Sequence, residues 1–246
     1  MIDAPYAPLT HGAPLTVGDE VDLDATAVSG LHFRKVNVKE AFTLRDAEGR
    51  FFRASLKALT ATAGSCLVYE QMPDSPESPV EITLVCAVLQ RQRMLWVAQK
   101  AAELGVARIQ PVFTLKSVQV DGLAHEKAHA WPGQSLKGAR QCRRGSVPEV
   151  LRTVTLDAYL ASPQWRDAEV KVFLDDRSDD DREALRPCKT LALVIGPEGG
   201  FANVERQKLI DAGAHPVRIG GRVLRAETAV VAGIVVAQHR VGDMGL

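Results

Sequence analysis

The pattern of hydrophobic and polar positions changes character near residue 72. Before that point, apolar and polar residues alternate over short segments, which is typical of half-buried strands. Three such segments are Phe42–Arg45, Phe51–Leu56 and Ser65–Glu70. Asp46–Gly49 stands between the first two and predicts a hairpin turn. We therefore predict a small β-rich barrel or sandwich in residues 1–72.

A proline-rich connector follows. Pro73, Pro76 and Pro79 recur every third residue among serines and acidic side chains. Such a composition favours an extended, solvated chain, because proline fixes its backbone angle and no apolar residue offers a core contact. We take residues 73–79 as a linker between two domains.

After the linker, short apolar runs alternate with segments of helical period. The predicted strands are 80–89, 108–113, 170–174, 191–195 and 217–219, and the predicted helices are 91–104, 136–144, 203–212 and 227–238. This alternation predicts an α/β domain with a mainly parallel sheet over residues 80–246. The last helix is apolar nearly all round, so we expect it to be buried against the sheet or a partner subunit.

Composition narrows the classes of function. The 246 residues are 46% hydrophobic and 24% charged with zero net charge, which is typical of a globular protein. Nucleic-acid binding would therefore need a local basic patch. The four cysteines are far apart and no histidine stands at metal-ligand spacing, so we expect reduced thiols and no metal. Without a recognisable signal peptide or membrane-length apolar run, we expect a cytoplasmic protein.

Two glycine turns are the strongest candidates for a binding site. An apolar run ends in Gly196-Pro197-Glu198-Gly199-Gly200, and a second ends in Gly220-Gly221 before the last helix. Glycines let main-chain groups approach a ligand closely. Neither turn matches the P-loop or the dinucleotide fingerprint. The alternative is purely structural: a tight strand-to-helix turn, with Glu227 and Thr228 capping the last helix and Arg225 in solvent.

These residues also carry a family resemblance. Ile195–Phe201, Glu205 and Gly220–Ala229 resemble the signature of the RsmE-type ribosomal RNA methyltransferases, which belong to the SPOUT superfamily. Further matches are Gln99–Val106, Gln141–Pro148 and, more weakly, His32-Phe33 with Asp46 and Gly49. The resemblance covers almost the whole chain and is most specific in residues 191–238.

The resemblance implies a trefoil-knotted α/β methyltransferase domain, preceded by a PUA-like β-barrel that binds RNA. It implies a homodimer and S-adenosylmethionine as cofactor, held by three knot loops. The implied substrate is N3 of a uridine in 16S rRNA (uridine 1498) of the small ribosomal subunit. The cofactor-binding residues carried over are Leu174, Ile195, Gly196, Pro197, Glu198, Gly199, Gly200, Ile219, Gly220, Arg222, Leu224, Thr228 and Ala229.

Chemistry suggests catalytic roles for three residues. Methyl transfer from a sulfonium is mainly a positioning problem, but the uridine imide must lose its N3 proton. We hypothesise that Arg225 orients the base and stabilises developing charge, and that Glu198 or Glu227 is the base or an orienting carboxylate. For RNA binding the candidates are Arg34, Lys35, Arg91, Arg93, Lys137, Arg140, Arg143 and Arg144.

Two other interpretations remain open. The substrate could be tRNA or large-subunit rRNA. Alternatively, the chain could be a non-catalytic RNA- or ribosome-binding protein on the same fold, with its basic segment a solvated surface.

Overall fold

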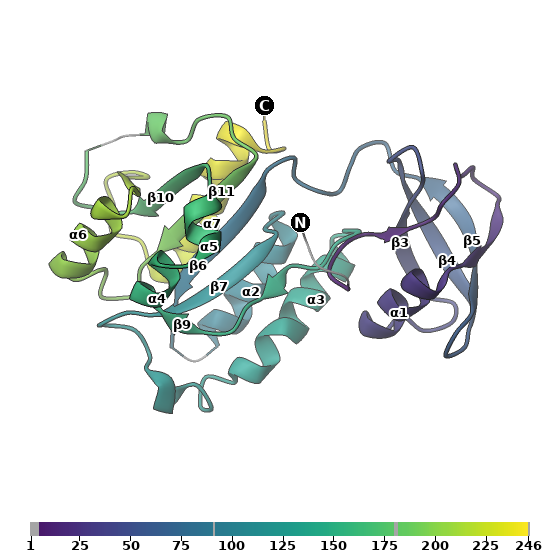
Figure 1. Cartoon of the computed structure of the whole chain (residues 1–246), viewed down its shortest axis with the longest axis horizontal. Helices are drawn as coiled ribbons and strands as arrows, with labels where there is room; N and C mark the ends of the chain where they lie inside the picture. The colour runs from purple at the N-terminus through teal and green to yellow at the C-terminus, as the bar shows by residue number, and fades with distance from the viewer. Residues whose placement is uncertain (1–4, 91, 180–181, 246) are drawn as a thin grey trace. The chain divides into compact units, whose positions relative to one another are not determined.

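The computed structural model describes residues 5–90, 92–179 and 182–245 (Figure 1). The chain forms two compact units, one of Met1–Glu77 with Ala139–Val147 and one of Ser78–Gly138 with Pro148–Leu246. The main chain passes from the first to the second within the proline-rich segment where the linker was predicted. The sequence pattern assigned all of residues 80–246 to the α/β domain, whereas the structure places Ala139–Val147 in the first unit.

Hydrogen bonds within the first unit explain that placement. The carboxylate of Glu77 accepts the backbone N–H groups of Gly145 at 2.9 Å and Ser146 at 2.8 Å. The N–H of Val147 donates to the carbonyl of Tyr6 at 2.9 Å. These partners are far apart in sequence, so no local pattern could have predicted that Ala139–Val147 belongs to the first unit.

The first unit is built on a five-stranded sheet. Its strand order is β1-β3-β4-β5-β2, and every pairing is antiparallel except β1 with β3. The strands are β1 (Leu9–Thr10), β2 (Glu20–Leu23), β3 (Ala41–Arg45), β4 (Phe51–Leu59) and β5 (Gly64–Gln71). The three strands predicted here are confirmed as β3, β4 and β5. Their inward side chains, among them Leu44, Phe52 and Leu56, form a core of their own.

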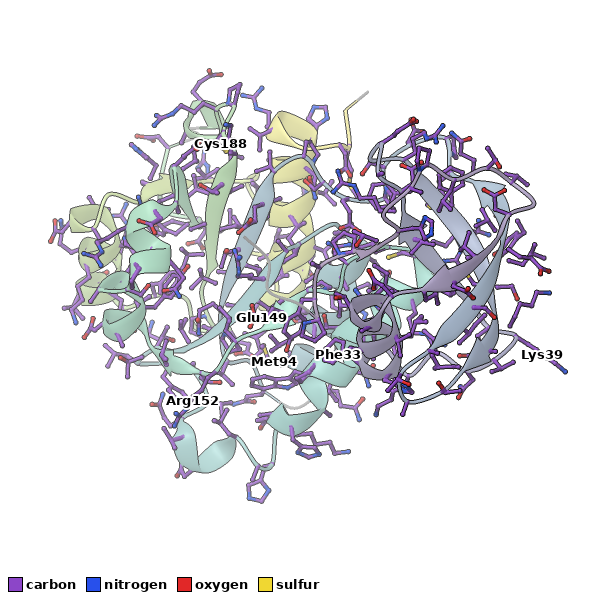
Figure 2. The ribbon with its side chains drawn as sticks, turned by 45° about the vertical axis from the view of Figure 1, so that its right-hand side comes forward. Phe33, Lys39, Met94, Glu149, Arg152 and Cys188 are labelled. Atoms are coloured by element: carbon purple, nitrogen blue, oxygen red, sulfur yellow. The ribbon has the colours of Figure 1, made fainter. Side chains whose placement is uncertain are left out.

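A helix in this unit was not predicted. Helix α1 (Ala25–Phe33) begins after Asp24, whose side chain accepts the N–H of Ala27 at 2.7 Å. The turn that follows places Lys35 (φ 53°) and Lys39 (φ 76°) in the left-handed region. The side chain of Lys39 extends into solvent there (Figure 2).

The second unit contains a parallel sheet (Figure 1). Its order is β12-β10-β11-β6-β7-β8, with β9 also pairing with β7. The strands are β6 (Glu81–Ala87), β7 (Arg108–Phe113), β8 (Glu149–Val150), β9 (Val154–Thr155), β10 (Val170–Leu174), β11 (Thr190–Ile195) and β12 (His215–Val217). All these pairings are parallel, which confirms the predicted sheet type.

Helices cover both faces of this sheet. Leu191, Leu193 and Ile195 of β11 face a core shared with α2 (Arg93–Glu103) and α7 (Ala226–Val241). Ala192 and Val194 face the opposite core, which is closed by α4 (Leu156–Leu160), α5 (Pro163–Asp167) and α6 (Asn203–Asp211). Successive side chains of β11 thus point to opposite faces of the sheet and belong to two separate apolar cores.

The last helix lies against the sheet as expected. Helix α7 contacts both α2 and β11, and its Val230, Ile234 and Ala237 are fully buried. Among the described residues, no helix is long and apolar enough to cross a membrane.

Some element boundaries differ from the prediction. Helix α3 (Trp131–Gln141) begins five residues earlier than expected, because a buried Trp131 anchors its first turn and Pro132 is tolerated there. It ends early because Arg143 adopts a left-handed φ of 65° and the N–H of Arg144 returns to the carbonyl of Ala139. Arg91, predicted to begin α2, lies outside the described residues.

Candidate functional site

A pocket lies where three neighbouring parallel strands end. The loops after β10, β11 and β12 line a cavity of 390 Å³, together with the first turn of α7. Crevices outside the carboxyl ends of strands are the usual ligand sites of open α/β sheets. The volume lies within the range of clefts that bind small molecules.

The structure brings nearly all of the predicted cofactor-binding residues into this pocket. Those that line it are Leu174, Ile195, Gly196, Pro197, Glu198, Gly199, Gly200, Ile219, Gly220, Arg222, Leu224 and Ala229. Thr228 is exposed and is not part of the lining. The two glycine turns therefore face one shared cavity, as the sequence suggested.

Glycine is required in these turns for two different reasons. Gly200 (φ 64°) and Gly220 (φ 119°) adopt left-handed backbone angles that side chains disfavour. Gly196 instead lies against Phe201, where an added Cβ would come within 3.2 Å of the ring. The N–H of Gly200 donates to the carbonyl of Pro197 at 2.8 Å and closes the turn.

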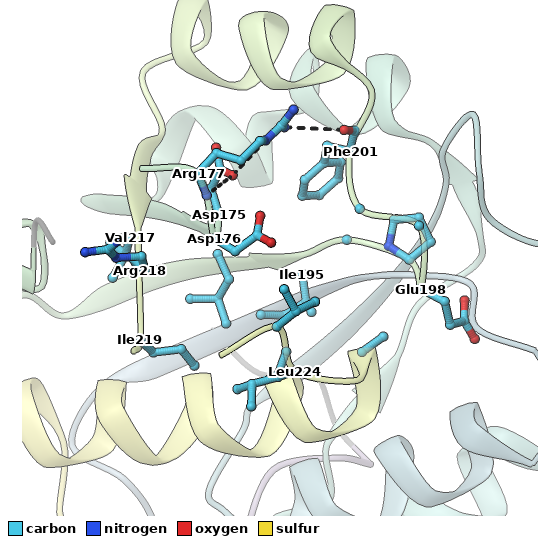
Figure 3. Close-up of a pocket in the computed structure, with 18 of the residues that line it drawn as sticks. Asp175, Asp176, Arg177, Ile195, Glu198, Phe201, Val217, Arg218, Ile219 and Leu224 are labelled. Atoms are coloured by element: carbon cyan, nitrogen blue, oxygen red, sulfur yellow. Dashed lines mark hydrogen bonds and ion pairs between the residues drawn. The ribbon is translucent and has the colours of Figure 1, made fainter. Parts of the chain in front are cut away.

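The loop after β10 contributes two carboxylates. Burial opposes ionisation of Asp175, but hydrogen bonds from Arg206 and Arg177 outweigh that effect and lower its pKa. Arg177 also donates to the side chain of Asn203 at 2.9 Å, so it ties this loop to α6. Asp176 is exposed, and its carboxylate extends into the pocket (Figure 3).

Sequence reasoning missed several residues that line the pocket. They are Lys116, Asp175, Asp176, Arg177, Phe201, Val217, Arg218, Val223 and Ala226. Three of them, Asp175, Asp176 and Arg177, form a run of charged residues directly after Leu174, and that run could have identified them. Lys116 carried no signal, because only folding brings its Nζ to 2.8 Å from the carbonyl of Gly199.

Two of the three candidate catalytic residues share one cation. Glu198 Oε1 forms an ion pair with Arg93 and accepts the backbone N–H of Gln90 at 3.3 Å. Glu227 Oε1 lies 3.7 Å from Arg93 Nε, and its Oε2 is buried without a hydrogen-bond partner among the described residues. The third candidate, Arg225, is exposed and precedes the first residue of α7. Glu198 lines the pocket, whereas Arg225 and Glu227 lie beside it.

Two of the arginines predicted to bind RNA are buried in the structure. Arg34 is buried, and its guanidinium donates to the carbonyls of Pro5, Ala7, Gly30 and Gly145. Arg144 is buried and forms an ion pair with Glu77 at 2.8 Å. Both guanidinium groups have their partners inside the first unit, so they are not part of the exposed cationic surface.

The other predicted RNA-binding residues divide into three groups. Lys35, Lys137, Arg140 and Arg143 are exposed, although Arg140 pairs with Glu40 and Arg143 with Glu70. Arg93 is engaged by the two carboxylates described above. Arg91 lies outside the described residues.

Comparison with known proteins identifies relatives over most of the chain. A model described as an RNA methyltransferase domain matches residues 76–238. A ribosomal RNA small subunit methyltransferase E from Buchnera aphidicola is 30% identical, over 68% of this chain and 69% of that protein. A protein of the same name from Mycobacterium bovis is 29% identical over 90% of this chain and 84% of its own length.

A solved structure covers still more of the chain. It is a ribosomal RNA small subunit methyltransferase E from Neisseria gonorrhoeae bound to S-adenosyl methionine. The two chains are 30% identical and superpose with a TM-score of 0.69, over 97% of this chain and 100% of the other.

Proposed function

The chain belongs to the family of RNA methyltransferase domains, and from that premise we propose that it methylates small-subunit ribosomal RNA with S-adenosylmethionine as methyl donor. The observation that carries the proposal is the pocket formed by three loops at the ends of β10, β11 and β12. It combines an intact pair of glycine turns with charged side chains. An enzyme acting on ribosomal RNA would work in the cytoplasm.

The pocket suits the methyl donor chemically. Leu174, Ile195 and Leu224 offer an apolar surface for a flat purine ring, with main-chain groups of the glycine turns at its edge. Arg218 and Arg222 can meet the amino-acid carboxylate, while Asp176 can meet a positive group or the ribose hydroxyls. S-adenosylmethionine supplies the methyl group from its sulfonium centre.

We further propose the finer features of the family resemblance. These are a SPOUT-type trefoil knot around the pocket, a PUA-like first unit, a homodimer, and an assembled small subunit as substrate. The knot is supported by the way β11 and β12 flank β10 while the chain after β12 returns to α2 and β11 through α7. The exposed cations Lys35, Arg140 and Arg143 of the first unit, and Lys137 of the second, are the proposed phosphate contacts.

For the chemical step, we propose that Glu227 rather than Glu198 accepts the N3 proton of the target uridine. Glu198 Oε1 already forms an ion pair with Arg93 and accepts the N–H of Gln90, whereas Glu227 Oε2 has no hydrogen-bond donor among the described residues. A buried carboxylate oxygen without a donor is costly unless a ligand supplies one. The side chain of Glu227 is 20% exposed, so part of it is accessible to an incoming base. Arg225, at the entrance of α7, orients the base and stabilises the charge that develops on its oxygens.

The test compares Glu227→Gln with Glu198→Gln on intact small subunits, using radiolabelled methyl donor. General-base catalysis contributes about a hundredfold or more, so we expect that loss in kcat for Glu227→Gln at pH 7. The loss should shrink as the pH rises, because the imide then ionises without help. Wild-type activity of Glu227→Gln at pH 7 would exclude Glu227 as the base.

Mass spectrometry of the modified nucleotide then shows which RNA is the substrate. Methylation of tRNA or large-subunit rRNA would replace the proposed substrate. Failure of the wild-type protein to bind S-adenosylmethionine in calorimetry would favour the non-catalytic RNA-binding interpretation.

A further inference from the structure

One cation connects the two glycine turns of the pocket. Arg93, the first residue of α2, pairs with Glu198 in the turn after β11 and lies 3.7 Å from Glu227 in the first turn of α7. The two glutamates are separated by a whole helix and strand in the sequence. Their only shared ionic partner among the described residues is Arg93, and it belongs to neither turn.

The ion pair between Arg93 and Glu198 holds the glycine turn after β11 on the side that faces away from the pocket. Figure 3 shows the side chain of Glu198 pointing away from the other residues that line the pocket. Its carboxylate is held by Arg93 and by the N–H of Gln90, so its main chain is presented to the cavity. The same turn is tethered from another side, where Lys116 donates to the carbonyl of Gly199.

The contact between Arg93 and Glu227 lies at the start of α7. Gly220, Arg222, Val223, Leu224 and Ala226 line the pocket, and this segment runs directly into the helical turn that carries Glu227. A cation held at Glu227 therefore restrains the end of this second turn. Since both turns line the same cavity, the distance between their main chains depends on what holds them together.

We propose that Arg93 is a positioning residue, which joins the two glycine turns through Glu198 and Glu227 and keeps the methyl-donor pocket at its binding width. This inference rests on the proposed function and replaces the phosphate-binding role that the sequence suggested for Arg93. The planar guanidinium has N–H groups in a rigid fork, so one side chain can serve two carboxylates in different directions. A lysine ammonium at the same position offers a point charge without the fork.

The expected effect is modest because the contacts are partly solvated. The side chains of Arg93, Glu198 and Glu227 are 37%, 31% and 20% exposed. Two such pairs together correspond to roughly a tenfold change in an equilibrium constant. We expect Arg93→Ala to weaken S-adenosylmethionine binding about tenfold, and Arg93→Lys to recover part of that loss.

Calorimetry on the full chain, with S-adenosylmethionine as the probe, tests the inference. The matched control is Arg240→Ala: Arg240 is 39% exposed and pairs with Glu183 at 3.2 Å, away from both turns. The control should bind the donor as the wild type does. In a double-mutant cycle, Glu198→Gln combined with Arg93→Ala should cost less than the sum of the single losses, since both remove one contact.

A measurement without ligand separates this inference from the proposed function. Hydrogen exchange at the Gly200 amide, which donates to Pro197, should be faster in Arg93→Ala than in Arg240→Ala. The positioning role would be overturned if Arg93→Ala left hydrogen exchange at the Gly200 amide unchanged. It would also be overturned if Arg93→Ala raised the KM for RNA but left the affinity for S-adenosylmethionine unchanged. If Arg93→Ala does not fold, Arg93→Gln carries the same expectations. Faster exchange in a protein that binds no donor would support the ionic connection and reject the proposed function.

Discussion

Replacing Gly196 by alanine tests whether the pocket depends on close packing behind its first glycine turn. Gly196 does not have a left-handed φ, so the backbone itself accepts alanine. The added Cβ would lie 3.2 Å from two carbons of the Phe201 ring and 3.5 Å from a third. Phe201 is buried and packs edge-to-face on Phe173 with ring centroids 6.1 Å apart, so it has little room to retreat.

The magnitude follows from two opposing effects. Overpacking a core by one methyl group costs about 1–3 kcal/mol. The alanine also restricts the unfolded chain, which returns about 0.4–1 kcal/mol. We expect a net loss of about 1 kcal/mol, equivalent to a fall of about 2–4 °C in melting temperature for a chain of this size. Because Gly196 lines the cavity, a displaced ring should also weaken S-adenosylmethionine binding.

The assay is thermal unfolding and calorimetric titration, with Gly221→Ala as the control. Gly221 also lies in a glycine turn, but an added Cβ meets no described atom within 4 Å and its φ is not left-handed. The control should keep the affinity and melt at or slightly above the wild-type temperature, because it restricts the unfolded chain without overpacking the core. A Gly196→Ala protein that melts at or above the wild-type temperature with unchanged affinity would refute the packing argument.

Two further predictions concern stability. Gln238 is fully buried; its side chain accepts a hydrogen bond from the hydroxyl of Ser78 at 2.9 Å and donates one to the carbonyl of Leu104 at 2.8 Å. Gln238→Leu leaves both partners unpaired, so it should lower the free energy of unfolding, measured with denaturant, by about 2 kcal/mol or more. A loss smaller than that of a surface substitution would contradict this. Asp175 has a lowered pKa, so its charge stabilises the folded state above the unfolded pKa and this contribution disappears as the pH falls through the folded value. The wild type should therefore exceed Asp175→Asn in melting temperature at pH 7, and the difference should shrink below about pH 4; a pH-independent difference would count against it.

The first glycine turn shows how much of the site could be predicted locally. An apolar run that ends in Gly-Pro-Glu-Gly-Gly requires a strand that breaks into a turn, and the structure places that strand in the middle of the parallel sheet. The second turn follows the same logic before an apolar helix. That both turns line one cavity could be suggested from the sequence because parallel strands end at the same edge of a sheet.

The electrostatic partners could not be predicted in this way. Arg34, Arg93 and Arg144 are indistinguishable from surface cations in the sequence, yet the structure buries two and pairs the third with two glutamates. An arginine signals its charge but not which carboxylate or carbonyl it meets. Those partners lie up to 134 residues away, as for Arg93 and Glu227, and only the packing of α2 against α7 brings them together.

The sequence by itself determined the main strands and helices of the parallel sheet and the glycine turns, because hydrophobic period and glycine conformation act over a few neighbouring residues. It did not reveal α1 or the short strands and helices such as β8, β9, α4 and α5. Only the tertiary structure decided that Ala139–Val147 belongs to the first unit, that Lys116 reaches Gly199, and that Arg93 connects the two turns. Each of these depends on hydrogen bonds or ion pairs between distant segments. Their energies exist only after the chain has folded, so no local pattern of residues encodes them.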